Sequence, residues 1–179
     1  MKNVLVLYWS HDGHTARVAR RICETIRQEG HAAEMMNVIE ADREGVDLDA
    51  YDVIVMGAAI RYGYFNKAFI NFANKNAAKL NSKPNSFFNL TLIARKPEKR
   101  TIEGNVYARK FVENSLWKPK EVKCIAGKVD YPNWNWFDAI QIQLIMSMTN
   151  GPTDKSVVAD YTDWDDVKEY ARHILTLAD

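Results

Sequence analysis

The side chains best suited to bind a small anion come directly after the first apolar run of the chain, Asn3–Tyr8. They supply hydroxyl, imidazole and backbone N–H donors around one glycine that lets the backbone turn. Because a helical pattern begins at once behind them, free N–H groups and the positive end of a helix dipole would face the same anion. The stretch is typical of a phosphate site, although a plain turn with a Ser, Asp or Thr helix cap would use similar residues. The residues are Ser10, His11, Asp12, Gly13, His14 and Thr15.

The spacing narrows the kind of phosphate that this loop would hold. The lysine of a GxxxxGK[ST] loop is absent, and Gly13 stands alone where a GxGxxG motif needs three glycines. A dianionic monophosphate, held mostly by hydroxyls and backbone N–H groups, fits these residues better. No cluster of His, Cys, Asp or Glu has the spacing of metal ligands, so we predict no metal site.

The elements that must position this loop alternate along the chain. Apolar runs predict five strands, at 3–8, 32–38, 52–59, 86–94 and 121–128. Apolar residues at helical spacing predict helices at 15–28, 66–80, 107–115 and 163–177, the last with Thr162 as its cap. This alternation predicts an α/β fold, a doubly wound and mostly parallel sheet with helices on both faces. Ligands of such sheets bind at the carboxyl ends of the strands, where residues 10–15 would lie.

Length and composition fit one domain that buries a core of its own. The chain has 179 residues, of which 47% are hydrophobic, and its formal net charge of +1 gives no global field that would indicate nucleic acid. No run reaches the roughly 20 apolar residues of a spanning helix, and we expect no secretory leader. Cys23 and Cys124 are far apart and predict free thiols. Lys and Arg outnumber Glu between Arg95 and Lys128, which indicates either a face for an anionic ligand or lipid, or a solvated surface.

The pattern Y-x-S-x-x-G-x-T, formed by Tyr8, Ser10, Gly13 and Thr15, resembles the FMN phosphate loop of flavodoxins. The alternation of strands and helices resembles their fold over nearly the whole chain, which implies the strand order 2-1-3-4-5. By this resemblance residues 10–15 hold the phosphate of FMN, and the loops after the third and fourth strands contact its ring. The ring-contacting residues so implied are Ala58, Ala59, Ile60, Gly63, Leu92, Ile93, Ala94 and Arg95.

Four further stretches indicate a particular family among the relatives of flavodoxins. IRYG (60–63), ARKPEKRT (94–101), YARKF (107–111) and YTDW (161–164) are similar to those of the quinone-dependent protoporphyrinogen oxidases of bacterial haem synthesis, a family of long-chain flavodoxin relatives. The resemblance implies FMN-dependent oxidation of protoporphyrinogen IX to protoporphyrin IX, with menaquinone or ubiquinone as electron acceptor. It also implies a cytoplasmic protein associated peripherally with the inner membrane, and no nucleic-acid partner.

Several side chains could serve that chemistry. Arg61 and Tyr62 end the third strand, where a cation near the flavin would favour hydride acceptance, so we assign them a catalytic role. A macrocycle with two propionates needs cations and an apolar face, since arginine pairs with carboxylates in a fork. We hypothesise that the protein supplies placement rather than acid–base groups, with substrate and quinone reacting in turn. The candidate substrate-binding residues are Lys96, Arg100, Arg109, Trp134 and Trp136.

The segment 131–153 interrupts the last strand–helix unit and fits the insertion of the long-chain family. It is apolar and aromatic, and Asp138 is its only charge. Periodicity leaves its conformation open, because one set of residues shares a helical face while IQIQL alternates like a strand. Three interpretations compete: packing as core, a roof over the substrate site, and contact with the membrane interface. The helical face would contain Phe137, Ile140, Leu144, Ile145 and Met148.

Other functions on the same fold stay open at this point. An NAD(P)H-dependent quinone reductase would need a nicotinamide site, and the sequence contains no second dinucleotide motif. A flavodoxin-type electron carrier would serve a protein partner, although such carriers are usually strongly acidic near the flavin. A third alternative has the fold but binds no flavin.

Overall fold

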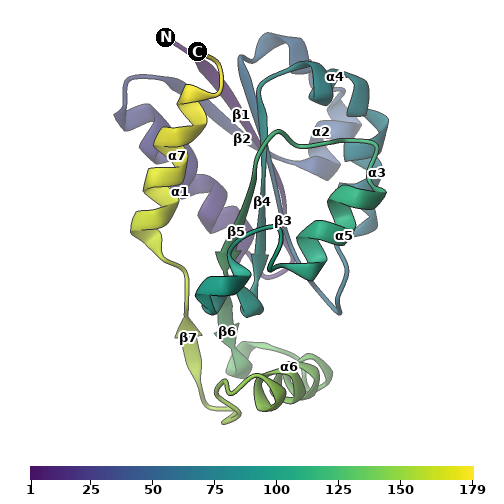
Figure 1. Ribbon diagram of the computed structural model, residues 1–179, viewed down its shortest axis with the longest axis vertical. Coiled ribbons are helices and arrows are strands. Elements are labelled where there is room, and N and C mark those ends of the chain that lie inside the picture. Colours follow the sequence, from purple (N-terminus) through teal and green to yellow (C-terminus); the bar gives the residue numbers. More distant parts are fainter.

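A five-stranded parallel sheet runs through the middle of the molecule in the order β2-β1-β3-β4-β5 (Figure 1). The computed structural model describes residues 1–179. The central strands β3 and β4 are buried almost throughout, as expected for a sheet covered on both faces. This architecture confirms the predicted flavodoxin-like doubly wound sheet. The strands are β1 (Asn3–Trp9), β2 (Ala32–Asn37), β3 (Val53–Ala59), β4 (Asn85–Thr91) and β5 (Val122–Ala126).

Helices cover both faces of this sheet (Figure 1). Helices α1 and α7 pack on one face and bury a core that includes Val18, Ile22 and Ile174. The other face carries α2, α3, α4 and α5 over a second core that includes Phe69, Phe87 and Trp117. Apolar residues at helical spacing place one stripe of each helix in these cores. The helices of the two layers are α1 (His14–Gln28), α2 (Val38–Glu44), α3 (Lys67–Lys75), α4 (Ala77–Ser82), α5 (Val106–Asn114) and α7 (Trp164–Thr176).

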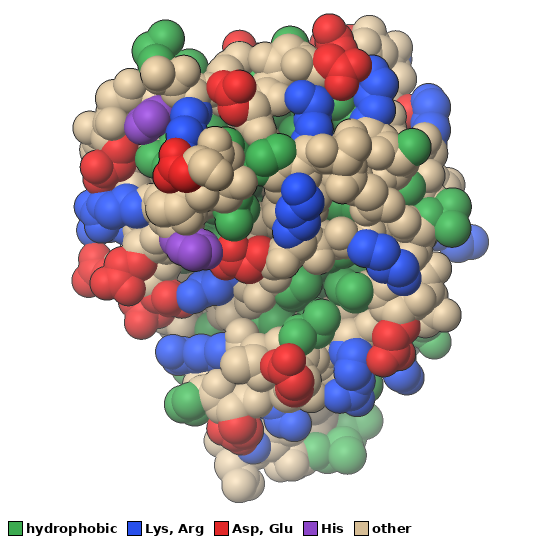
Figure 2. Space-filling view, turned by 45° about the horizontal axis from the view of Figure 1, so that its top comes forward, with side chains coloured by type: hydrophobic (Ala, Val, Ile, Leu, Met, Phe, Trp, Pro, Cys, Tyr) green, Lys and Arg blue, Asp and Glu red, His purple; other side chains and the backbone are tan.

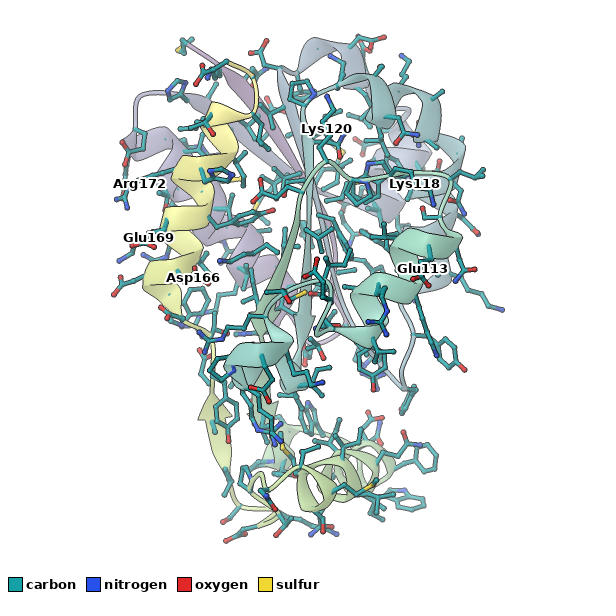
Figure 3. The ribbon with its side chains drawn as sticks, viewed as in Figure 1. Glu113, Lys118, Lys120, Asp166, Glu169 and Arg172 are labelled. Carbon is teal, nitrogen blue, oxygen red and sulfur yellow. The ribbon has the colours of Figure 1, made fainter.

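Charged side chains lie on the outer surface of the two layers. Glu169 and Arg172 point away from the sheet on α7, and Glu113 does so on α5 (Figure 3). Lys and Arg are interspersed with Asp and Glu over the face shown in Figure 2. Opposite charges mixed in this way give no broad field of one sign, in keeping with the net charge of +1.

A separate excursion follows β5 at the carboxyl ends of the strands. Strand β6 (Lys128–Asp130) pairs antiparallel with β7 (Val158–Asp160), and helix α6 (Trp136–Met148) lies between them in the chain. Both termini lie at the opposite end of the molecule (Figure 1). The excursion has a small core of Val129, Tyr131, Ala139 and Met146. The segment 131–153 is therefore helical over most of its length and extends from the end of the sheet where ligands bind.

Some element boundaries differ from the sequence prediction for local reasons. The predicted helix 66–80 is two helices, because the side-chain amide of Asn76 donates to Phe72 O at 2.9 Å and ends α3 there. The predicted strand 86–94 ends at Thr91 and continues as a short 3₁₀ turn, Leu92–Arg95. The predicted strand 121–128 ends at Ala126, and the chain leaves the sheet at Gly127.

The predicted cap of the last helix is wrong. Asp163 caps α7, since its Oδ1 accepts a hydrogen bond from Asp166 N–H at 3.1 Å. The hydroxyl of Thr162 instead donates to the carbonyl of Ala126 at 2.8 Å and is buried. Thr162 thus ties the start of α7 to the end of β5, beside the candidate site.

Candidate functional site

The loop between β1 and α1 places a glycine, which has no side chain to act as a cap, directly before the helix. Gly13 has φ of +90°, a left-handed conformation that glycine adopts without strain, and α1 begins directly after it with no side-chain cap. Within the loop, Gly13 N–H donates to Ser10 Oγ at 3.0 Å and His14 N–H donates to Asp12 Oδ1 at 3.2 Å. Of the N–H groups in the first turn of α1, only that of His14 donates to a side chain, so the helix start can still bind an anion.

Thr15 provides the test of whether a phosphate group fits this loop. Its hydroxyl is buried and has no hydrogen-bond partner in the protein. A buried hydroxyl without a partner costs free energy, which a bound acceptor would recover. Together with the uncapped helix start, Thr15 gives the loop the donors that a phosphate monoester needs. The residues present therefore fit the phosphate of FMN.

The two histidines of the loop have different surroundings. His11 is exposed and stacks on Trp9, with 6.3 Å between ring centroids. His14 is buried, and its Nε2 lies 2.8 Å from the hydroxyl of Thr162. Because that hydroxyl donates to Ala126, its oxygen accepts from His14 Nε2–H. Burial lowers the pKa of His14 below its ordinary value, so the imidazole is neutral near pH 7 and joins the loop to the end of the excursion.

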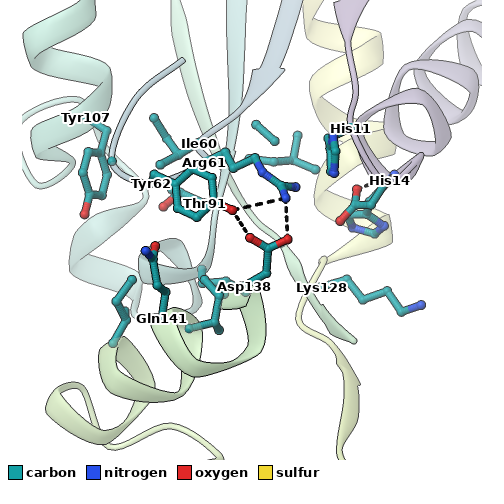
Figure 4. A pocket seen from close by; sticks show the side chains of 18 of the residues that line it. His11, His14, Ile60, Arg61, Tyr62, Thr91, Tyr107, Lys128, Asp138 and Gln141 are labelled. Atoms are coloured by element: carbon teal, nitrogen blue, oxygen red, sulfur yellow. Dashed lines mark hydrogen bonds and ion pairs between the residues drawn. The ribbon is translucent and has the colours of Figure 1, made fainter. Parts of the chain in front are cut away.

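A cavity of about 140 Å³ lies between the carboxyl ends of the strands and α6 (Figure 4). Its upper wall comes from the phosphate loop, the segments that follow β3, β4 and β5, and Tyr107 of α5. We call this the body wall. Its lower wall is formed by Trp134 and the residues of α6 that face the sheet, and we call this the insert wall. The body wall contains Trp9, His11, Asp12, His14, Ala59, Ile60, Arg61, Tyr62, Gly63, Leu90, Thr91, Leu92, Ile93, Tyr107, Gly127 and Lys128; the insert wall contains Trp134, Asp138, Gln141, Ile142 and Ile145.

Arg61 and Tyr62 join the two walls at one side of this cavity. Both side chains hydrogen-bond the carboxylate of Asp138, and Arg61 forms an ion pair with it (Figure 4). Asp138 lies in the first turn of α6, where a negative charge is stabilised by the helix dipole. The amide of Asn135 also donates to Asp138, at 2.7 Å. In this arrangement the charge of Arg61 is balanced by the insert.

The turn that carries Arg61 and Tyr62 is tight. Arg61 and Tyr64 exchange two backbone hydrogen bonds, at 2.9 and 3.0 Å. Tyr62 and Gly63 both have positive φ, of 51° and 81°, as in a two-residue type I′ hairpin. A left-handed tyrosine is unusual, and the bond from its hydroxyl to Asp138 helps to hold it there.

Arg95 attaches the other end of α6 to the body. Its Nη2 donates to the carbonyl and to the hydroxyl of Thr149, both at 2.7 Å, and its Nη1 donates to Leu92 O at 3.1 Å. Thr149 follows the last residue of α6, so a cation here also complements the negative end of the helix dipole. Two arginines that the sequence analysis assigned to catalysis and to the flavin thus hold the two ends of the insert helix.

A second, polar hollow of about 690 Å³ adjoins the phosphate loop. It contains Arg17 and Lys128. Lys128 forms an ion pair with Asp130 at 2.7 Å, and Arg17 lies 3.6 Å from Asp160. Each of these cations is therefore matched by a carboxylate of the excursion.

The predicted site residues separate into two groups. Eleven positions line the first cavity, Gly13 lines the polar hollow, and Ser10 and Thr15 belong to the same loop. The remaining predicted residues lie outside both linings. The eleven are His11, Asp12, His14, Ala59, Ile60, Arg61, Tyr62, Gly63, Leu92, Ile93 and Trp134; those outside are Ala58, Ala94, Arg95, Lys96, Arg100, Arg109 and Trp136.

The residues outside the linings have other surroundings. Ala58 and Ala94 are fully buried in apolar clusters. Arg100 donates to Ala94 O at 3.1 Å, and Arg109 donates to Glu103 O at 2.8 Å. These arginines therefore support their own loops rather than face the cavity.

Sequence reasoning missed several lining residues. In the sequence Asp138 is only the single charge of its segment, and this isolation is the one indication of a specific partner. Lys128 belongs to the basic segment, and nothing in the sequence indicates that it lines the cavity. Gln141, Ile142 and Ile145 depend on the orientation of α6, which its periodicity left open.

The opposite side of α6 is apolar and exposed. Trp136, Ile140, Leu144 and Met148 recur every fourth residue and expose 74%, 45%, 63% and 79% of their surface, and Phe137 exposes 50%. Of the face predicted from periodicity, only Ile145 turns toward the cavity. This stripe does not pack as core. No helix in the structure is both long and apolar enough to pass through a bilayer.

Comparison with known proteins adds the following. The flavodoxin domain family matches residues 5–156. The chain is 42% identical to a protoporphyrinogen IX dehydrogenase (quinone) from Escherichia coli (strain K12), over 98% of this chain and 96% of that protein. It is 38% identical to a protein of the same name from Leishmania major, over 97% of this chain and 74% of that protein. Among solved structures, oxidised Flavodoxin 2 from Bacillus cereus has a TM-score of 0.58 at 16% identity, covering 97% of this chain and 98% of its own.

Proposed function

This chain belongs to the flavodoxin domain family, within the group of proteins named protoporphyrinogen IX dehydrogenase (quinone), and from that premise we propose that it catalyses the FMN-dependent oxidation of protoporphyrinogen IX to protoporphyrin IX in haem biosynthesis. The electron acceptor in this proposal is a quinone, menaquinone or ubiquinone. The observation that carries the proposal is the cavity between the body wall and the insert wall, with a phosphate loop at one end and an apolar helix opposite.

The body wall is the proposed FMN site. Ser10 to Thr15 would hold the phosphate, with Thr15 as a donor whose hydroxyl is otherwise without a partner. Ala59 to Gly63, Leu92 and Ile93 would flank the ring, because these loops line the same cavity. When bound there, FMN supplies two-electron redox chemistry, and the protein residues hold it and keep water from its ring.

The insert wall is the proposed site for the apolar ligands. Trp134, Ile142 and Ile145 offer an aromatic and aliphatic surface to a macrocycle or a quinone. The predicted propionate ligands Lys96, Arg100 and Arg109 do not line the cavity, whereas Arg61 and Lys128 do. We therefore favour Arg61 for a substrate carboxylate, because its guanidinium can bind a carboxylate in a fork.

The exposed stripe of α6 supports contact with the inner membrane from the cytoplasmic side. Trp136, Ile140, Leu144 and Met148 form an apolar surface, and Asp138, the only charge of the helix, faces the body. Exposed tryptophan and aliphatic side chains are stabilised at the boundary between headgroups and acyl chains. In this proposal residues 1–179 form a single flavodoxin-like domain, and the insertion at about 131–153 brings the cavity close to the quinone.

An anaerobic titration tests the proposed reaction. FMN-loaded protein is titrated with protoporphyrinogen IX while flavin absorbance and porphyrin fluorescence are followed, and a menaquinone analogue is then added. We expect the flavin to bleach, the porphyrin to appear and the quinone to restore the flavin. Bleaching by NADPH but not by porphyrinogen would favour an NAD(P)H:quinone reductase. A stable semiquinone without porphyrin formation would favour an electron carrier.

A further inference from the structure

Arg61 uses only part of its hydrogen-bonding capacity. Its Nη2 donates to Asp138 and approaches the hydroxyl of Tyr62, whereas Nε and Nη1 have no hydrogen-bond partner in the protein. A guanidinium has five N–H donors in a rigid fork that matches a carboxylate. The ring of Tyr62 lies against the guanidinium, 5.1 Å from centroid to Cζ, and keeps it at the cavity. Arg61 can therefore bind a carboxylate from a ligand.

Asp138 would keep partners if Arg61 turned to a ligand. The hydroxyl of Tyr62 and the amide of Asn135 both donate to its carboxylate. Its position in the first turn of α6 stabilises the negative charge further. Leaving a buried charge without any partner is strongly unfavourable, and these contacts avoid that cost.

The size of the cavity gives a reason for such a change. Its volume of about 140 Å³ is below the roughly 300–1,000 Å³ of typical ligand pockets, although it is meant to hold a flavin ring and a macrocycle. The adjoining hollow of about 690 Å³ shares Trp134 and Asp138 with this cavity, so a movement of the first turn of α6 away from the body would join the two spaces. The pair Arg61–Asp138 is the charged contact that holds the first turn of α6 against the body.

The opposite end of α6 is held differently. Arg95 binds the carbonyl and the hydroxyl of Thr149, which are neutral groups, and it lies outside the cavity lining. A ligand in the cavity thus meets the charged contact at one end of the helix and not the neutral contact at the other. If a ligand replaced the charged contact, the first turn of α6 would lose its ion pair to the body while the last turn would keep its bonds to Arg95.

We propose that Arg61 is a carboxylate-exchange site: Asp138 occupies it in the free protein, and a carboxylate of the bound tetrapyrrole takes its place and releases the first turn of α6. The inference rests on the proposed function, from which it takes its ligand class, a macrocycle with propionate groups. Asp138 is then an internal competitor of the carboxylate ligand. It lowers the affinity for that ligand, and it keeps the cavity closed when the ligand is absent.

The test compares protoporphyrin IX with its dimethyl ester, both in the same detergent, on FMN-loaded protein. Binding is followed by quenching of tryptophan fluorescence in the wild type, Asp138→Asn, Arg61→Gln and the control Asp130→Asn. Asp130 pairs with Lys128 in the neighbouring hollow and does not touch Arg61. We expect Asp138→Asn to bind the free acid at least about 10-fold more tightly and the ester with unchanged affinity. We expect Arg61→Gln to bind the free acid no more tightly than the ester. We expect Asp130→Asn to bind both ligands with the affinities of the wild type.

Two results would overturn the exchange. Weaker binding of acid and ester alike in Asp138→Asn would mean that the pair only holds α6 in place. A rise in affinity for the free acid in Asp130→Asn, and not in Asp138→Asn, would mean that Lys128 rather than Arg61 binds the carboxylate. Turnover of protoporphyrinogen IX by the wild type is measured alongside, so that a failure of the proposed function is seen separately from a failure of the exchange.

Discussion

The two walls of the cavity are held by different means. The body wall consists of loops that each follow a buried strand, and their positions are fixed by the sheet and its two cores. The insert wall is one helix on a small antiparallel pair, with a core of four buried residues and an arginine contact at each end. We infer that the body wall is a preformed cofactor site, and that the insert wall adapts to the second ligand.

The strongest test of the body wall is the substitution Thr15→Val. Because the hydroxyl of Thr15 is buried and has no partner, valine should leave the stability of the flavin-free protein unchanged or slightly raise it. The affinity for FMN should fall by roughly 10- to 100-fold, since a hydrogen bond to a charged group contributes about 1.5–3 kcal/mol. Fluorescence titration with FMN and urea unfolding of the flavin-free protein measure the two effects.

The matched control for that substitution is Thr25→Val. Thr25 is also buried on α1, but its hydroxyl donates to Arg21 O at 2.9 Å, away from the loop. FMN affinity should not change in this variant. If Thr15→Val also left the affinity for FMN unchanged, Thr15 would not be a ligand of the phosphate.

The contact at the last turn of α6 is tested by Arg95→Met. Loss of the bonds to Thr149 should speed amide hydrogen exchange at the end of α6 by roughly 10-fold, while the sheet keeps its protection. FMN affinity should stay unchanged, because Arg95 lies outside the cavity lining. Arg100→Met, which loses a bond only to Ala94 O, is the control. A large loss of FMN affinity in Arg95→Met would instead support the contact between Arg95 and the flavin that the sequence predicts.

The exposed stripe of α6 is tested by Leu144→Glu in sedimentation with vesicles of inner-membrane lipids. Leu144 exposes 63% of its surface, so its transfer into the interface should contribute about 1 kcal/mol, and binding should weaken by roughly 5- to 10-fold. Leu116→Glu changes a leucine of similar exposure, 67%, on the body and should bind like the wild type. Equal losses in both variants would mean that the stripe has no special part in membrane contact.

The smallest expected effect concerns His14, which joins the phosphate loop to the end of the excursion. Its pKa is lowered by burial from the ordinary value of 6.5, so the unfolded chain takes up its proton before the folded chain does. Stability should therefore fall as the pH drops below about 6.5 toward the folded pKa, and should not depend on this group above that range. His14→Gln keeps a donor for Thr162 and should flatten this part of the profile in urea unfolding at pH 5 to 7.5. If His14→Gln left the dependence of stability on pH unchanged, the lowered pKa of His14 would be contradicted.

How much the sequence could predict also differs between the walls. The five strands and the loop at 10–15 follow from runs of neighbouring residues, the strand order follows from the resemblance to flavodoxins, and all appear in the structure. The insert wall does not follow from such runs. Asp138 meets Arg61 across 77 positions, and Arg95 meets Thr149 across 54. The sequence predicts cations near these loops. Only the fold shows that the guanidinium of Arg61 faces the cavity and that the guanidinium of Arg95 binds the end of α6.

A crystal structure of the FMN-loaded protein with protoporphyrin IX tests the two-wall account most directly. We predict that the flavin phosphate lies in the loop 10–15 with Thr15 as a donor. The macrocycle should lie between the flavin ring and the insert wall, in contact with Trp134 and Ile142. A macrocycle bound instead on the outer basic surface near Lys96 and Arg109, with the cavity beneath α6 unchanged, would contradict the account.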